Sequence, residues 1–450
     1  MRPFPRNLRN FLVSALSLAL FAGASAARAQ DTDATLATDD GRRVRCSAEN
    51  GGITLPDHFC AAVVADQVGK ARHLALNPNG SLYVALANSE GANDGGVLAL
   101  RDTDGDGDAD VRQKFGSTGG NGLAYAFGHL FFAQDDKVVR YLLPPNRFLP
   151  IGNPVTVVSG LPHDGDHTNK TVVVGDSLRL LGSLFVNIGS ASNACQVENR
   201  VPFSPGVDPC PELPIRAGVW RFAAFRSGQD QRDGERYATG LRNMVALDVN
   251  PRDGRLYGVQ NGRDQLAELW PNIYTPEQDA LLPSEELFRI DRGANYGWPY
   301  CYHDPAIGKV LAPEYGGDGT TEGRCAAVRE PLQALPAHWA PLSMLFYTGR
   351  QFPDRYRQGV FVAFHGSRFD ATNQPAGPGY NVVFVPFGAD GRPSGGYEVF
   401  ADGFAVDTSD LPDSAVHRPV GLAQGPDGSL YISDDKGGRL WRVVYRGQDN

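Results

Sequence analysis

Two imidazoles and two carboxylates lie within five consecutive residues of this chain, His163-Asp164-Gly165-Asp166-His167. Histidine and carboxylate side chains ligate metal ions, and histidine also exchanges protons near neutral pH. The same residue types form ordinary polar turns on protein surfaces. Three interpretations therefore stay open from the local spacing: a metal site, one half of an acid–base pair, or a polar turn.

Carboxylates also recur at calcium-like spacing in the stretch DTDGDGDAD, at Asp102, Asp104, Asp106 and Asp110. The twelfth position of this loop is Gln113, where an EF-hand has a bidentate glutamate, and the flanking residues have strand character. These departures argue against an EF-hand. A small structural calcium loop and a solvated acidic turn remain as alternatives.

Two further stretches contain side chains or carbonyls suited to a charged ligand. In GLRNMVALDVNP, Arg242 and Asn243 precede a predicted strand and can donate to an oxygen that gains charge. The simpler interpretation is a loop arginine paired with a nearby carboxylate. In GVQNGRDQL, the loop containing Asn261 and Gly262 can turn backbone carbonyls toward a hard cation. By itself, neither stretch defines a site.

The elements that must position these residues are strands. An apolar stretch, a Pro/Gly turn and an alternating strand recur along the chain, and each unit is followed by a further strand such as VLALR or RLWRVVY. Such units at irregular spacing, with almost no helical periodicity, predict an all-β fold: a six-bladed β-propeller of four-stranded antiparallel blades. A two-domain β-sandwich is the structural alternative. The six units are 74–86, 122–134, 177–189, 247–259, 356–366 and 422–434.

The first 29 residues have the pattern of a cleavable signal peptide: three early arginines, an apolar core at 11–23 and Ala-Arg-Ala before Gln30. The alternative is a retained N-terminal anchor. We expect a flexible lead-in at 30–45 and the propeller domain at 46–446, in a protein that is periplasmic or secreted and has no stable membrane anchor. Loss of residues 1–29, with their four arginines, would change the formal net charge from −9 to −13. Such an acidic surface argues against nucleic acid as a partner.

All six cysteines lie in the part expected after cleavage, and no Cys-x-x-Cys occurs. Six cysteines allow fifteen pairings. In an exported protein we favour sequential disulfides over zinc ligation or a redox thiol. The expected pairs are Cys46–Cys60, Cys195–Cys210 and Cys301–Cys325.

Longer stretches of the chain resemble one known family. GLRNMVALDVNP, GVQNGRDQLAEL and ELFRIDRGANYGWPYC follow one another in the order and spacing of the soluble quinoprotein sugar dehydrogenases, which include the sorbosone and aldose sugar dehydrogenases. VFVAFHGSRFD and HRPVGLAQGPDGSLYISDDKGGRLWRV are similar to the same family, and the resemblance covers roughly residues 50–446. It implies a six-bladed propeller that uses pyrroloquinoline quinone (PQQ) and calcium.

The resemblance also implies roles for individual residues. His167 matches the general base, and Arg242 and Asn243 match residues that line the quinone. Asn261 and Gly262 match the loop whose carbonyls hold calcium. Arg418 matches an arginine near the acidic groups of the quinone.

Two departures from the family pattern concern the same site. Where glucose-oxidising members place an aspartate to support the histidine, this chain has Ser190, so we expect Asp164 or Asp166 to orient the imidazole instead. A quinone-contacting lysine is absent near FHGSR, where His365 and Arg368 are the expected substitutes.

The activity implied is hydride transfer from an aldose or a related, sorbosone-like sugar aldehyde to PQQ, with electrons leaving to an external quinone or cytochrome. A nicotinamide enzyme lacks support because no strand–GxGxxG–helix unit is visible. Two other functions remain open on the same fold: a calcium-dependent lactonase-type hydrolase and a non-catalytic sugar-binding propeller.

Overall fold

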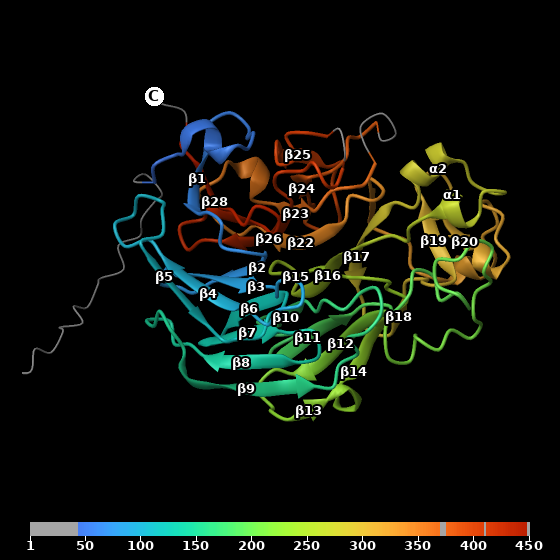
Figure 1. The fold of residues 1–450 in the computed structure, drawn as a ribbon, viewed down its shortest axis with the longest axis horizontal. Coiled ribbons are helices and arrows are strands. Elements are labelled where there is room, and N and C mark those ends of the chain that lie inside the picture. Colours follow the sequence, from blue (N-terminus) through green and yellow to red (C-terminus); the bar gives the residue numbers. More distant parts are fainter. Residues whose placement is uncertain (1–43, 370–374, 409–410, 448–450) are drawn as a thin grey trace, which may run out of the picture. The chain divides into compact units, whose positions relative to one another are not determined.

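The computed structural model describes residues 44–369, 375–408 and 411–447. Six sheets of mainly antiparallel strands form a ring, in which the innermost strand of each sheet contacts those of the two neighbouring sheets (Figure 1). The predicted six-bladed β-propeller is therefore confirmed. The predicted signal peptide at 1–29 and most of the lead-in at 30–45 lie outside the described residues.

The blades follow chain order from their innermost to their outermost strands. Blade 1 contains β2 (Ala71–Leu76), β3 (Leu82–Leu86), β4 (Gly96–Arg101) and β5 (Val111–Phe115). Blade 2 contains β6 (Gly122–Ala126), β7 (His129–Ala133), β8 (Val138–Leu142) and β9 (Ile151–Ser159). Blade 3 contains β10 (Val172–Val174), β11 (Ser183–Ile188), β12 (Gly218–Ala223) and β14 (Glu235–Thr239).

Blade 4 contains β15 (Ala246–Asn250), β16 (Arg255–Gln260), β17 (Glu285–Ile290) and β21 (Gln333–Leu335). Blade 5 contains β22 (Pro341–Phe346), β23 (Gly359–Phe364), β24 (Asn381–Pro386) and β25 (Glu398–Ala401). Blade 6 contains β26 (Pro419–Gln424), β27 (Leu430–Asp434), β28 (Leu440–Tyr445) and, at its edge, β1 (Phe59–Ala65). Because β1 pairs with β28, strands from both ends of the described chain complete blade 6, and the ring closes without an open edge between them.

Blades 2 and 3 differ from the four-stranded prediction because each gains a short parallel edge strand. β13 (Gln229–Asp230) pairs with β9, and β18 (Ala294–Asn295) pairs with β14. Both added strands come from later connecting segments that run past an exposed outer edge. Pairing these segments with the edge satisfies backbone groups that would otherwise face water.

Two of the six predicted strand pairs are placed wrongly. In 177–189 only β11 is a strand, because residues 177–180 form a turn in which the Leu180 amide donates to the Ser177 carbonyl. In 356–366 only β23 is a strand, since Tyr356 ends a 3₁₀ turn. The true inner partners are β10 and β22, which lie further upstream. Apolar side chains within turns, such as the exposed Leu178, produced the false strand pattern.

Outside the ring, β19 (Cys301–Asp304) and β20 (Gly308–Leu311) form a hairpin with the short helices α1 (Leu266–Leu269) and α2 (Pro276–Leu281) nearby (Figure 1). The Ser284 hydroxyl lies 2.7 Å from His303 Nδ1, and Lys309 pairs with Glu286 of β17. These contacts attach the hairpin to blade 4. The 3₁₀ turns are η1 (Ala48–Gly51), η2 (Gln231–Asp233), η3 (Pro313–Tyr315), η4 (Gly323–Ala327) and η5 (Asp354–Tyr356).

The cysteines pair sequentially, as Cys46–Cys60, Cys195–Cys210 and Cys301–Cys325. Ahead of the first of these, Val44 is buried against Ala62 and Val444 of blade 6. Within the described ranges, no helix has the length and apolar character needed to cross a membrane.

Strand register decides which loops meet. In every blade the start of the innermost strand lies opposite the end of the second strand; Val172 faces Val186 in blade 3, and Ala246 faces Val259 in blade 4. Loops that precede an innermost strand and loops that follow a second strand therefore share one end of the ring. We name this end the mouth.

Candidate active site

The site residues expected from the sequence converge on the mouth, although they come from four blades. His167, Arg242 and Arg418 precede innermost strands, whereas Asn261 and Arg368 follow second strands. The loop containing Asp102, Asp104, Asp106 and Asp110 lies instead between β4 and β5, at the opposite end. It is therefore separate from the mouth.

His167 is held through one ring nitrogen. Its Nδ1 lies 3.0 Å from the Ser190 carbonyl oxygen and 2.9 Å from the Ser190 hydroxyl. A carbonyl oxygen can only accept, so Nδ1 carries the proton and Nε2 is the basic nitrogen of the neutral ring. This is the tautomer that a general base requires.

The expectation that Asp164 or Asp166 orients this imidazole is wrong. Asp164 pairs with Arg216, and Asp166 lies 3.0 Å from Arg200 Nε. Both arginines belong to the connection between β11 and β12, and they draw the two carboxylates toward that connection. Ser190 occupies the orienting position itself.

Burial and, next in size, the nearby Arg242 cation lower the pKa of His167 to about 3, although the Ser190 carbonyl acts in the opposite direction. The imidazole is therefore uncharged throughout the pH range from 5 to 8. No carboxylate of the described residues hydrogen-bonds to Nδ1, so the ring is oriented without a strong stabilisation of its charged form.

The variant Ser190→Asp is expected to raise the pKa of His167 by more than about one unit, because a carboxylate beside Nδ1 stabilises the imidazolium. The measurement is an NMR titration of the labelled histidines, with the signal of His167 identified by its loss in His167→Ala. Ser190→Asn tests a polar side chain without the charge. A pKa that stays unchanged in Ser190→Asp would show that residue 190 does not control this imidazole.

Arg242 is buried and is held through four of its five N–H groups. Its Nε lies 3.1 Å from the Asn193 carbonyl, its Nη1 lies 2.6 Å from the Gly262 carbonyl, and its Nη2 lies 2.9 Å from both Asn193 Oδ1 and Asp264 Oδ2. Although burial alone would raise the pKa of Asp264, the Arg242 cation and then His338 hold it well below its usual range. Arg242 is thus a fixed cation at the mouth.

Asn243 presents an unused acceptor next to the base. Its Oδ1 is buried and has no hydrogen-bond partner among the described residues. Gly189 lies between the two side chains: a Cβ there would stand 2.5 Å from His167 Cβ and 3.2 Å from Asn243 Oδ1. Only glycine therefore fits at position 189, and the Asn243 Oδ1 is left as a buried acceptor without a described partner.

The loop of Asn261 and Gly262 is held in place by hydrogen bonds to Glu285 and Pro341. The buried carboxylate of Glu285 accepts from the Gly262 amide at 2.7 Å and from the Ala340 amide at 3.0 Å. Burial raises the pKa of Glu285 to about 7. Asn261 Nδ2 donates to the Pro341 carbonyl at 3.0 Å. Because the Gly262 carbonyl already accepts from Arg242, one of its two lone pairs remains.

The two other expected cations differ in their partners. Arg418 donates to the carbonyls of His365 and Gly366 at 3.0 and 3.2 Å, and it makes no ion pair with a described residue. Arg368, in contrast, pairs with both Glu268 and Asp279. Of these two, only Arg418 is therefore available, without rearrangement, to an anionic group of a ligand.

Several mouth residues escaped the sequence analysis. Arg72 pairs with Asp435, whose other oxygen lies 2.8 Å from His365 Nε2. Lys170 is fully buried, and this burial, only partly offset by the nearby charge of Asp135, lowers its pKa to about 8. SDDK, which contains Asp435, lies within a stretch already noted for family resemblance, so Asp435 had a sequence signal. Lys170 had none.

Asn193 was also missed and is central to the geometry. It is completely buried, and its carbonyl accepts from both Arg242 and Trp298 Nε1, at 3.1 and 3.0 Å. Its Oδ1 accepts a hydrogen bond from the Asp264 amide at 3.0 Å. An asparagine in a polar loop carries no recognisable motif, so only the fold identifies it.

Among the described residues, two groups of acidic or sulfur side chains have metal-like proximity. Asp102, Asp104 and Asp110 form one, and Cys195, Cys210 and Glu212 form the other. In the second, both sulfurs are bonded to each other in a disulfide and are not available as thiolates. Asp106 is not part of the first group. Its carboxylate accepts a hydrogen bond from the Asp108 amide.

Comparison with known proteins gives one family match: the model of the TrAA12-like family aligns with residues 53–446. A PQQ-dependent sugar dehydrogenase of Hypocrea jecorina is 26% identical over 318 residues, 65% of this chain and 66% of that protein. An uncharacterised protein of Borreliella burgdorferi is 30% identical over 208 residues, 46% of this chain and 48% of the relative. The chain thus spans just under two thirds of the H. jecorina protein and about half of the B. burgdorferi protein.

Solved structures share the fold. The calcium structure of a Trichoderma reesei family AA12 enzyme has a TM-score of 0.69 at 20% identity, covering 90% of this chain and 99% of that one. The holo PQQ domain of Coprinopsis cinerea pyranose dehydrogenase has a TM-score of 0.67 at 21% identity, covering 87% and 97%. The apo soluble aldose sugar dehydrogenase of Escherichia coli has a TM-score of 0.53 at 16% identity, covering 86% and 100%.

Proposed function

This chain belongs to the TrAA12-like family, and we propose that it is a PQQ- and calcium-dependent dehydrogenase that oxidises an aldose or a related, sorbosone-like sugar aldehyde. The likeness to the H. jecorina PQQ-dependent sugar dehydrogenase supports the cofactor and the substrate class. The observation that carries the proposal is a neutral His167, whose Nε2 has no hydrogen-bond partner among the described residues, beside the Asn243 side chain at the same mouth.

The residues at the mouth fit the cofactor. PQQ carries several carboxylates, and Arg418 is a cation there without an ion pair to a described residue. Asn243 lies beside the base, where its Oδ1 is a buried acceptor without a described partner. The proposal therefore assigns PQQ to Arg242, Asn243 and Arg418; a contact with Arg368 would require its two ion pairs to break.

Calcium would be held by the backbone carbonyls of Asn261 and Gly262, since carbonyl oxygens are ligands that calcium prefers. One lone pair of the Gly262 carbonyl remains for it beside Arg242. The proposal leaves a second calcium at Asp102, Asp104, Asp106 and Asp110 as a separate structural site, distant from the mouth.

When bound, PQQ supplies the acceptor for a hydride and calcium supplies a Lewis acid. His167 removes the proton of the sugar hydroxyl at Nε2, and Ser190 keeps the ring in the tautomer that allows it. Arg242, whose position is fixed by Asn193 and Asp264, stabilises negative charge that develops nearby. The general base needs no change of protonation at neutral pH.

The proposal places the enzyme outside the cytoplasm, in the periplasm or medium, with an external quinone or cytochrome as electron acceptor. The three disulfides support an oxidising compartment. The signal-like stretch at residues 1–29 is the second support.

Reconstitution tests the function directly. The chelator-treated protein is titrated with PQQ in the presence and absence of calcium, and reduction of an artificial dye is followed with a panel of aldoses. We expect quinone binding and dye reduction that both require calcium. The absence of both quinone binding and dye reduction would contradict the proposal. Hydrolysis of lactones by the same preparation would favour the lactonase alternative, and sugar binding without reduction would favour a non-catalytic propeller.

A further inference from the structure

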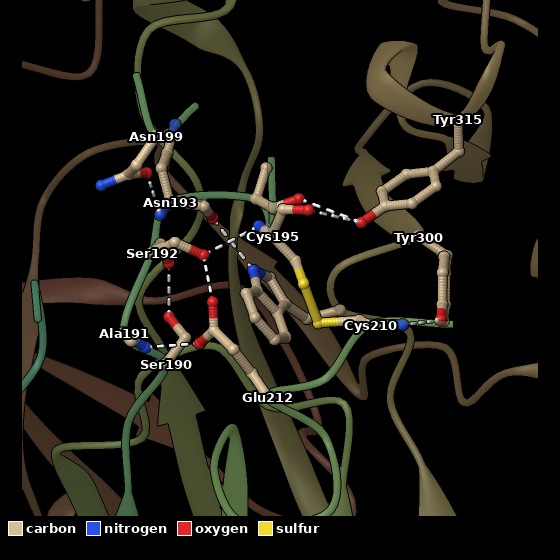
Figure 2. The surroundings of a disulfide bond; sticks show 12 residues. Ser190, Ala191, Ser192, Asn193, Cys195, Asn199, Cys210, Glu212, Tyr300 and Tyr315 are labelled. Atoms are coloured by element: carbon tan, nitrogen blue, oxygen red, sulfur yellow. Dashed lines mark hydrogen bonds between the residues drawn. A yellow bond between two sulfur atoms is a disulfide. The ribbon is translucent and has the colours of Figure 1, made fainter. Parts of the chain in front are cut away.

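The connection between β11 and β12, residues 189–217, is the segment that grips the loop of the general base. It contains the Cys195–Cys210 disulfide, and Figure 2 shows its first residues folded against Glu212. Arg200 and Arg216 of this connection pair with Asp166 and Asp164. This connection therefore contacts both the proposed base and the loop that carries it.

Glu212 lies two residues beyond Cys210 and binds the turn formed by residues 190–192 through both carboxylate oxygens. One oxygen accepts from the Ala191 amide and the other from the Ser192 hydroxyl (Figure 2). Ser192 Oγ in turn accepts from the Cys195 amide at 2.9 Å. The disulfide therefore fixes both Glu212 and the turn to which it binds.

A continuous chain of hydrogen bonds leads from this carboxylate to the base. The single hydroxyl proton of Ser190 is donated to the Ser192 carbonyl at 2.7 Å. Ser190 Oγ can then only accept, which it does from His167 Nδ1 at 2.9 Å. The Ala191 amide held by Glu212 belongs to the same peptide group as the Ser190 carbonyl, which accepts from Nδ1 at 3.0 Å. Because Glu212 also holds the Ser192 side chain, it fixes both acceptors of the Nδ1 proton; without it, rotation of this peptide and of the Ser190 hydroxyl would permit the opposite tautomer.

We propose that Glu212 is a positioning residue that selects the Nδ1-protonated tautomer of His167 through Ser192 and Ser190. Its catalytic consequence rests on the proposed function, whereas the tautomer itself does not. The largest influences on the pKa of His167 are burial and Arg242, and they do not include Glu212. The carboxylate thus orients the imidazole without converting it to the charged form.

The same turn also leads into the residue that holds Arg242. Asn193 follows Ser192 directly and binds Arg242 through its carbonyl and its Oδ1. Displacement of the turn would therefore alter the base and the fixed cation together. This predicts that loss of Glu212 acts mainly on turnover and not on sugar binding.

The test uses the full-length protein labelled at histidine nitrogens, measured by NMR without added cofactor and by kinetics after reconstitution. In the unaltered protein we expect His167 to carry its proton on Nδ1. Glu212→Ala should produce a mixture of tautomers and lower kcat about tenfold, with KM changed less than twofold. Glu212→Gln retains one acceptor for the Ser192 hydroxyl. Its tautomer ratio and its kcat should lie between those of the unaltered protein and those of Glu212→Ala.

Glu198→Gln is the matched control, because Glu198 belongs to the same disulfide loop but has an exposed side chain. It should leave the spectrum and kcat unchanged. Thermal unfolding of each variant identifies loss of fold, and Ser192→Ala, which retains the carboxylate, should reproduce the tautomer mixture. An unchanged His167 spectrum in folded Glu212→Ala overturns the inference. A changed spectrum in a protein without dehydrogenase activity would contradict the proposed function alone.

Discussion

Replacing His167 with alanine is expected to lower kcat by about 10²- to 10⁴-fold, the range that a positioned general base contributes. The ring is partly buried and its contacts are those to Ser190, so its removal should change the unfolding free energy little. KM for the sugar should change less than kcat, because the base acts mainly in the transition state. The measurement is steady-state dye reduction by the PQQ- and calcium-loaded protein.

His163 provides the control in the same loop. It is exposed, and its Nδ1 lies 3.3 Å from the Leu161 carbonyl oxygen. His163→Ala should retain full activity. If His167→Ala also retains it, the base assignment is wrong, even though the fold and the family membership stand.

Arg242→Ala has the second largest expected effect, and it acts on stability as well as on turnover. The change leaves Asn193, Gly262 and Asp264 without their shared donor. Unpaired buried acceptors and a partly uncompensated carboxylate should lower the unfolding free energy by about 3 kcal/mol. Asp264 keeps its contact with Arg200, which limits the loss.

Turnover of Arg242→Ala should fall by more than about 10²-fold, in the range found when an electrostatic donor is removed from an active site. Urea unfolding and dye reduction measure the two effects separately. Arg242→Lys keeps the charge but cannot reproduce the planar fork, so it should recover stability only in part. Arg236→Ala removes an exposed arginine from β14 and should be neutral in both assays. An Arg242→Ala protein that loses stability but keeps its kcat would limit Arg242 to a structural role.

Much of the fold was predictable because its signals are local. Alternating apolar residues and Pro/Gly turns identified four of the six inner hairpins, and the sequential cysteine pairing followed from three short loops. The errors at 177–189 and 356–366 arose where apolar turn residues imitate a strand. Local pattern cannot distinguish these cases, because burial of Leu180 and exposure of Leu178 depend on neighbouring blades.

For the site, the residue types in the sequence determined the chemistry that is available: a histidine base, two cations and a loop of carbonyls. Only the tertiary structure decided how they act. The stretch His163–His167 alone was compatible with a metal cage, yet its aspartates pair with Arg200 and Arg216, and its base is oriented by Ser190. These partners are separated from it by 23 to 52 residues in the chain. A propeller brings such distant loops together at one end of the ring, so the proton on His167 is placed by contacts that no local spacing encodes.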